Sequence, residues 1–170
     1  MAVHRPSRLR SFTYVGLHRY FLTFCTFERR RHFEAADIVH RVWSQIVRAA
    51  DDEEFEVHAY CFMPDHLHML VAGAADYSDG RRFISRAKQF SGYEFSRARG
   101  SRLWQEYGYE HTLRDTDDGA GVVRYILENP VRAGLAATPD AYRYSGSMRY
   151  SVPELLTAVT WRPPQSRDRR

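Results

Sequence analysis

The chain has 170 residues, of which 44% are hydrophobic and 27% charged, as in one ordinary globular domain. No stretch approaches the roughly 18 consecutive apolar residues of a membrane-spanning helix, and residues 1–6 lack the apolar core of a signal peptide. These features argue against a membrane or secreted protein. We expect a cytoplasmic protein with a single domain over residues 1–150 that includes a basic arm at about residues 1–12.

The net charge is +4, and Lys88 is the only lysine beside many arginines. Arginine forms bidentate hydrogen bonds with phosphate and stacks on bases, so the excess of arginine over lysine favours a nucleic-acid partner. Genome base composition can produce the same bias. Cys25 and Cys61 both lie in apolar segments, which is typical of reduced, buried thiols. A metal-binding role for Cys61 is a second interpretation.

The first half of the chain predicts a strand, a helix and a hairpin. Residues 20–27 are rich in aromatic and β-branched types, as strands are. Apolar residues recur at helical spacing over 35–50, and the acidic run 51–54 is typical of a solvated turn. Residues 55–62 and 66–72 predict two further strands joined by a turn at Met63-Pro64-Asp65.

The second half predicts a helix over 81–99, a short strand over 109–113 and a helix over about 119–129 that Pro130 stops. Residues 151–170 are expected to be a basic, largely disordered tail. The order strand, helix, strand, strand, helix, strand matches a ferredoxin-like split βαβ sheet. The expected fold class is therefore α+β, with one additional C-terminal helix.

His66 and His68 lie two residues apart in a predicted strand. Side chains at i and i+2 of a strand point to the same face, which suits two imidazoles that hold one metal ion. Each histidine alone is more often a hydrogen-bonded structural residue.

Tyr125 and Asn129 are i and i+4 on the last predicted helix, hence neighbours on one face. With a divalent ion held by His66, His68 and the Asn129 oxygen, a phosphodiester would be polarised and the Tyr125 hydroxyl could attack it. Taken alone, a tyrosine such as Tyr125 is typical of an ordinary core or surface position. An asparagine before a proline, such as Asn129 before Pro130, is typical of a helix C-cap.

The segments Pro64-Asp65-His66-Leu67-His68, Leu103-Trp104-Gln105 and Tyr125-x-x-x-Asn129-Pro130-Val131-Arg132-Ala133-Gly134 occur in this order. Together they resemble the REP-associated tyrosine transposases, single-strand transposases of the HUH (His-hydrophobic-His) nuclease superfamily. The strand at 20–27 with Arg29-Arg30, and Tyr142 to Ser147 in degraded form, are also similar. The resemblance covers roughly residues 14–148.

The resemblance implies the HUH core fold, with His66 and His68 as metal ligands and Asn129 at the third ligand position. Tyr125 would be the nucleophile that forms a 5′-phosphotyrosine and releases a 3′-hydroxyl, with Mg²⁺ or Mn²⁺ as the metal. The substrate would be single-stranded DNA beside small hairpins, the repetitive extragenic palindromes (REP elements) of bacterial genomes.

The chain departs from the family pattern at Asp65, where asparagine is frequent, and at Tyr107-Gly108, where arginine and an aromatic are frequent. We interpret Asp65 as a turn residue. Neither departure touches the proposed catalytic residues, so recognition of a particular hairpin is what they put in question. The residues that we expect to contact DNA are Arg29, Arg30, Arg31, Arg82, Arg86, Lys88 and Tyr107.

Two other functions stay open at this point. The first is a catalytically inactive or domesticated module that binds hairpin DNA. The second is a small zinc hydrolase built on His66-x-His68, which needs a further ligand such as Asp65 or His58. The chain is expected to act as a monomer or a homodimer, with the monomer favoured, and to use single-stranded and hairpin DNA as partners.

Overall fold

The structure is a computed structural model that describes residues 13–113 and 117–159. The predicted N-terminal arm and the last part of the predicted tail lie outside the described residues. The elements in chain order are β1 (Arg19–Cys25), η1 (Phe27–Arg29), η2 (His32–Glu34), α1 (Ala36–Asp52), β2 (Phe55–Met63), β3 (His66–Gly73), α2 (Gly80–Arg99), β4 (Tyr109–Leu113), α3 (Gly119–Arg132), η3 (Pro139–Ala141), β5 (Ser145–Gly146) and α4 (Val152–Ala158).

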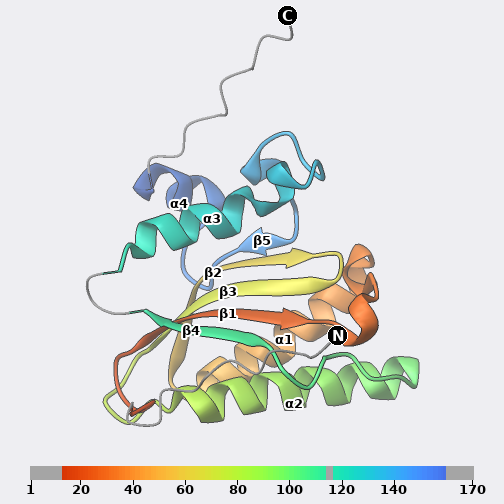
Figure 1. Cartoon of the computed structure of the whole chain (residues 1–170), viewed down its shortest axis with the longest axis horizontal. Helices are drawn as coiled ribbons and strands as arrows, with labels where there is room; N and C mark the ends of the chain where they lie inside the picture. The colour runs from red at the N-terminus through yellow and green to blue at the C-terminus, as the bar shows by residue number, and fades with distance from the viewer. Residues whose placement is uncertain (1–12, 114–116, 160–170) are drawn as a thin grey trace, which may run out of the picture.

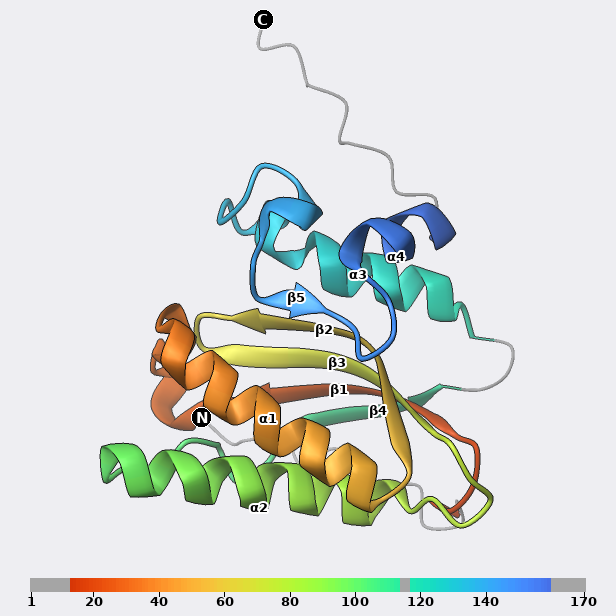
Figure 2. The ribbon, with the colours of Figure 1, turned by 180° about the vertical axis from the view of Figure 1, so that it is seen from behind.

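The described strands form one antiparallel sheet in the order β4-β1-β3-β2-β5. Its first four strands have the connections of a ferredoxin-like split βαβ fold, which confirms the predicted fold class. Helices α1 and α2 cover one face of this sheet, whereas α3 and α4 lie on the opposite side (Figures 1 and 2).

The sheet separates two hydrophobic clusters because successive strand residues point to opposite faces. Leu67, Met69 and Val71 of β3 belong to the larger cluster beneath α1 and α2. Leu70 belongs to the smaller cluster, which Ile126 and Leu127 of α3 complete. The alternation leaves His66 and His68 on the α3 side.

The prediction that Pro130 stops the last helix is wrong, because α3 continues to Arg132 with Pro130 inside it. Proline lacks an N–H, but its carbonyl can still accept a hydrogen bond. Here the Pro130 carbonyl accepts a hydrogen bond from the N–H of Leu135 at 2.8 Å. Gly134 takes a positive φ of 70° and donates to the carbonyl of Val131. This is a Schellman end, so the glycine terminates the helix.

The predicted tail at 151–170 is corrected over its first part, where residues 152–158 form α4. Ser151 caps this helix and exchanges hydrogen bonds with Glu154, a capping box that the sequence carries. Leu155 and Val159 are buried against the α3 side of the sheet. The two-residue strand β5, which the sequence did not predict, pairs with the edge of β2.

The acidic run at 51–54 is not a wholly solvated turn. α1 extends into it to Asp52, and Glu53 is buried at 7% exposure. Its carboxylate pairs with Arg86 Nε at 2.7 Å and Arg82 Nε at 3.1 Å, and this joins the end of α1 to α2. Over the described part of the chain, no helix is long and apolar enough to cross a membrane.

Candidate active site

The turn between β2 and β3 fixes where the two histidines begin. The Asp65 carbonyl accepts hydrogen bonds from the backbone N–H of Thr26 at 3.0 Å and from its hydroxyl at 2.9 Å. The Pro64 carbonyl accepts from the N–H of Phe33 at 3.0 Å. The hairpin end is therefore tied to the chain that follows β1, and His66 starts β3 at a defined position.

The Nε2 atoms of His66 and His68 lie 3.2 Å apart. The Nδ1 atom of His66 is hydrogen-bonded to Asp65 Oδ1 at 2.7 Å, and Nδ1 of His68 to Thr23 Oγ1 at 2.8 Å. If each Nδ1 carries the proton, both Nε2 lone pairs face the same point. Two nitrogens that each lie about 2.1 Å from one cation can have this separation, so the pair fits a metal ion.

Burial and nearby charge keep His68 in the neutral form that can bind a cation. His68 is 7% exposed, and its burial, followed by the charges of His66 and Arg29, lowers its pKa to about 3. The imidazole is thus neutral at physiological pH, as a ligand must be.

Asp65 is held as a carboxylate beside His66. Burial raises the pKa of Asp65, but the hydrogen bond with His66 and the charge of Arg29 more than offset this and leave the pKa below its ordinary value. Arg29 Nε pairs with Asp65 Oδ2 at 2.8 Å. The interpretation of Asp65 as a turn residue was incomplete, since its side chain also orients His66.

Helix α3 places Tyr125 beside the histidines of the same chain. The Tyr125 ring centroid lies 5.7 Å from that of His68 and 5.8 Å from that of Phe21. The side chain is 38% exposed, so a substrate can reach its hydroxyl from solvent. The guanidinium of Arg132 lies 5.5 Å from the ring centroid.

Asn129 lies one turn after Tyr125 on the same helix face and is partly exposed. Its Nδ2 donates to the Tyr125 carbonyl at 2.8 Å, which fixes the orientation of the amide. Its Oδ1 accepts no hydrogen bond from the described residues, so this oxygen is available to a cation.

The two cysteines do not extend the histidine pair. Burial raises the pKa of the Cys61 thiol to about 12, which disfavours the thiolate that metal binding requires. Among residues 13–113 and 117–159, no three His, Cys, Asp or Glu side chains are grouped so that they could hold a metal ion. This counts against the zinc hydrolase, which needs such a third ligand.

All five arginines that we expected to contact DNA have carboxylate partners. Arg29 pairs with Asp65, and Arg82 and Arg86 both pair with buried Glu53. Two exposed pairs are Arg30 with Glu28 and Arg31 with Glu34. Exposed pairs of this kind contribute about 0–1 kcal/mol, so a phosphate can replace the carboxylate. The ion pairs of Arg82 and Arg86 with Glu53 are structural, because they join the end of α1 to α2.

Lys88 and Tyr107 are the other two predicted DNA contacts. Lys88 Nζ donates to the carbonyls of Gln105 at 2.7 Å and Glu106 at 3.1 Å. Tyr107 is 42% exposed. Both line a pocket beside α2.

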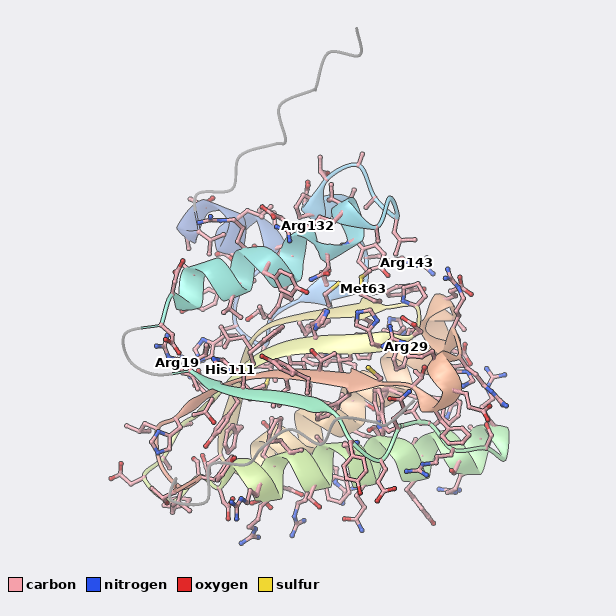
Figure 3. All side chains as sticks on the ribbon, in the orientation of Figure 1. Arg19, Arg29, Met63, His111, Arg132 and Arg143 are labelled. Carbon is pink, nitrogen blue, oxygen red and sulfur yellow. The ribbon has the colours of Figure 1, made fainter. Side chains whose placement is uncertain are left out.

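Sequence reasoning missed three residues at the site: Thr23, the orienting role of Asp65, and Arg132. Thr23 faces His68 through the β1–β3 register, which no sequence signal gives. Arg132 is seven residues after Tyr125, so helical spacing alone could have found it. Figure 3 shows Arg29, Arg132 and Arg143 near Met63 in this view; Arg29 pairs with Asp65, and Arg132 pairs with Glu128 at 2.6 Å.

Known proteins resemble this chain in sequence and in shape. Residues 14–129 match the family of IS200-like transposases. A REP-associated tyrosine transposase of Escherichia coli strain K12 is 33% identical over 120 residues, which are 68% of this chain and 68% of that protein. A Haemophilus influenzae protein assigned to the REP-associated tyrosine transposases is 28% identical over 153 residues, with 82% and 84% covered.

One solved structure has a similar shape. It is described as a REP-associated tyrosine transposase bound to a REP hairpin, and it matches with a TM-score of 0.66 over 82% of this chain and 81% of that chain. The identity is 24%, so the match supports the fold.

Proposed function

We propose that this chain, which belongs to the IS200-like transposase family, cleaves and rejoins single-stranded DNA beside small hairpins through a covalent link to Tyr125. The observation that carries the proposal is the packing of Tyr125 against His68, with 5.7 Å between their ring centroids. The proposed nucleophile and the two imidazoles proposed to hold a metal ion therefore lie side by side within one chain. Because the site needs no residue of a second copy, we propose that a monomer is sufficient.

His66, His68 and the Asn129 oxygen are the groups that would hold Mg²⁺ or Mn²⁺. When bound, such a cation supplies a Lewis acid that polarises a phosphodiester oxygen. The chain prepares the site for it: Asp65 and Thr23 orient the two imidazoles through their Nδ1 atoms, and the hydrogen bond from Asn129 to the Tyr125 carbonyl fixes the amide.

Tyr125 supplies the nucleophile. Its hydroxyl oxygen forms a bond to phosphorus while the bond from phosphorus to the 3′-oxygen breaks, and the phenol proton ends, in net terms, on the released 3′-hydroxyl. The 5′-phosphotyrosine conserves the energy of the broken bond. A free 3′-hydroxyl can reverse the step and join strands.

Hairpin DNA is the proposed partner because the matched solved structure is of a relative bound to a REP hairpin. Arg29 and Arg132 lie beside the site, and Arg132 approaches the Tyr125 ring. Their contribution would be independent of sequence and sensitive to salt.

The test uses single-stranded oligonucleotides with a hairpin and unpaired flanks, incubated with the full chain and Mn²⁺ or Mg²⁺. Wild-type protein should give a covalent adduct on a denaturing gel, and mass spectrometry should map it to Tyr125. Tyr125→Phe should abolish the adduct and leave binding within about twofold. Tyr77→Phe, at a tyrosine that is 71% exposed, is the matched control and should react normally.

Three results would count against the proposal. An adduct that persists in Tyr125→Phe would assign the nucleophile elsewhere. Adduct formation that is undiminished in excess EDTA would remove the metal from the mechanism. If wild-type protein bound the hairpin without any adduct, the chain would be a binding module.

A further inference from the structure

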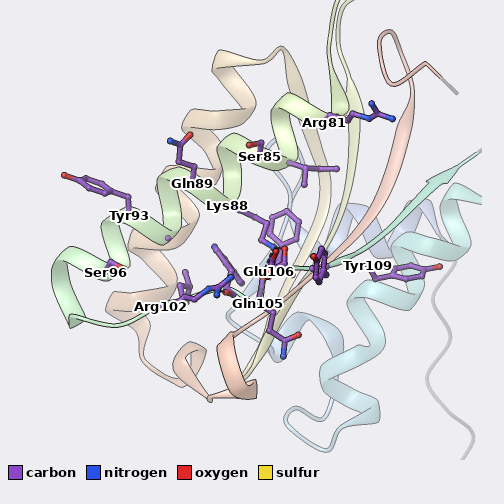
Figure 4. Close-up of a pocket in the computed structure, with 17 residues that line it drawn as sticks. Arg81, Ser85, Lys88, Gln89, Tyr93, Ser96, Arg102, Gln105, Glu106 and Tyr109 are labelled. Atoms are coloured by element: carbon purple, nitrogen blue, oxygen red, sulfur yellow. Dashed lines mark hydrogen bonds between the residues drawn. The ribbon is translucent and has the colours of Figure 1, made fainter. Parts of the chain in front are cut away.

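A hollow lies beside α2. It is a pocket of about 740 Å³ between this helix and the segment 102–109, which leads into β4. We call it the α2 groove and define it by Arg81, Ser85, Lys88, Gln89, Tyr93 and Ser96 together with residues 102–109. Figure 4 shows these side chains spread along α2 from Arg81 to Ser96, with Arg102, Gln105 and Glu106 alongside.

The groove follows one continuous face of α2. Its residues recur three or four positions apart, which is the spacing of a single helix face. From Arg81 to Ser96 the helix rises about 22 Å, enough for several units of an extended polymer. Ser85 and Gln89 are exposed on this face, and their side chains make no hydrogen bond to the described residues.

The floor of the groove is apolar and firmly packed. Phe24, Leu103 and Trp104 line it and are 2%, 1% and 4% exposed. Trp104 Nε1 donates to Ser91 Oγ at 2.8 Å, and Lys88 ties α2 to the opposite wall through two carbonyls. The groove is therefore built into the fold.

The groove carries positive charge that the protein does not neutralise. Neither Arg81 nor Arg102 has an ion-pair partner among the residues that the structure describes. Each guanidinium lies over a ring, Arg81 at 4.3 Å from Tyr14 and Arg102 at 5.4 Å from Phe27, and Arg102 Nε also donates to the Trp104 carbonyl at 2.8 Å. Glu106 is the one acidic residue of the described lining. The positive charge of the groove favours a polyanion as its ligand. The apolar floor favours a polyanion that also carries apolar groups.

Three exposed tyrosines border the groove. Tyr93, Tyr107 and Tyr109 are 66%, 42% and 52% exposed. Exposed rings beside arginines are the arrangement with which proteins hold unpaired bases, since every base can stack on an aromatic face. A paired duplex hides those faces, so the tyrosines favour a single strand.

The groove approaches the active site over the free edge of the sheet. Tyr109 lines the groove from β4, and its ring centroid lies 6.1 Å from that of Phe21. Phe21 in turn contacts His68 and Tyr125, with centroid distances of 5.5 and 5.8 Å. One strand can therefore occupy the groove and continue around β4 to Tyr125.

We propose that the α2 groove binds several unpaired nucleotides of the DNA strand, with bases on its tyrosines and phosphates on Arg81 and Arg102. This proposal rests on the proposed function, because it concerns the same strand on which Tyr125 acts. Contacts of this kind tolerate many sequences and weaken with salt.

The first test places carboxylates in the groove. Ser85→Glu with Gln89→Glu adds two negative charges at i and i+4, and His40→Glu with Ser44→Glu adds the same pair on the exposed face of α1. Anisotropy of a fluorescein-labelled 12-nucleotide oligothymidine should show about tenfold weaker binding for the groove pair at low salt. The α1 pair should bind within about twofold of wild type, and circular dichroism checks that both fold.

The second test separates stacking from charge. Tyr93→Ala should weaken oligothymidine binding by about tenfold, whereas Tyr93→Phe keeps the ring and should bind like wild type. If Tyr93→Ala and the groove carboxylate pair both bound oligothymidine as tightly as wild type, the proposal would be overturned. A loss that appears equally with a 12-base-pair duplex would overturn it as well, because the occupant would then not be unpaired.

The adduct on Tyr125 distinguishes failure of the groove from failure of the proposed function. If wild type forms the adduct and the groove variants bind oligothymidine normally, the groove proposal alone is wrong. If oligothymidine binding depends on the groove but no adduct forms, the groove stands and the transfer chemistry is wrong.

Discussion

Replacing Thr23 with valine isolates the hydrogen bond that orients His68. Valine keeps the branched shape that suits a strand and replaces the hydroxyl with a methyl group. The lost contact is the 2.8 Å bond between Thr23 Oγ1 and His68 Nδ1. His68 is 7% exposed, so water has little access to replace the missing partner.

Two magnitudes follow from this geometry. A buried polar group without a partner costs about 1–3 kcal/mol, so the metal-free variant should be less stable by that amount. Loss of the group that orients a metal-ligating histidine typically weakens metal binding by about 10–100-fold. The reason is that the imidazole can then place its proton on Nε2, where the cation would bind.

Calorimetric titration with Mn²⁺ measures the affinity, and urea unfolding in EDTA measures the stability. Thr23→Ser keeps the hydroxyl and should retain both values far better than Thr23→Val. If Thr23→Val lost stability but bound Mn²⁺ within about twofold of wild type, the bond would be structural only. The positioning role of Thr23 would then be refuted.

Three other outcomes follow from the ion pairs and from the pKa of His68. Asp65→Ala should weaken Mn²⁺ binding by about tenfold or more in the same titration, and Asp65→Asn by less, because the amide still offers His66 an acceptor. In EDTA the free energy of unfolding should fall as the pH drops from 6.5 towards 3, because unfolded His68 then binds a proton that the folded ring, with its pKa lowered to about 3, excludes. A pH series of urea unfolding should show a shallower fall for His68→Asn, and an equal slope would contradict this. Glu53→Ala should destabilise the protein by about 2 kcal/mol because it removes charged hydrogen bonds to a buried carboxylate, while Glu34→Ala, at an exposed pair, should change thermal unfolding little.

The residue pattern within each segment was sufficient to predict most of the helices and strands. The apolar segment over 66–72 and helical spacing over 35–50 and 81–99 predicted elements that the structure contains with shifts of one or two residues at their ends. The errors came where one strong local signal was taken as decisive. A proline was expected to stop α3, yet the glycine four residues later ends it. A basic C-terminal end was expected to be a tail, yet a capping box and two apolar residues make α4.

Strand and helix periods are local properties of the chain, so the residue pattern already places His66 and His68 on one face and Tyr125 and Asn129 on another. That these two faces meet follows from three-dimensional packing alone. That contact depends on α3 lying over β2 and β3, and on the register that sets Thr23 opposite His68. The same packing decided which arginines are neutralised by buried Glu53 and which remain available along the α2 groove, since ion pairs between distant segments leave no periodic trace in sequence.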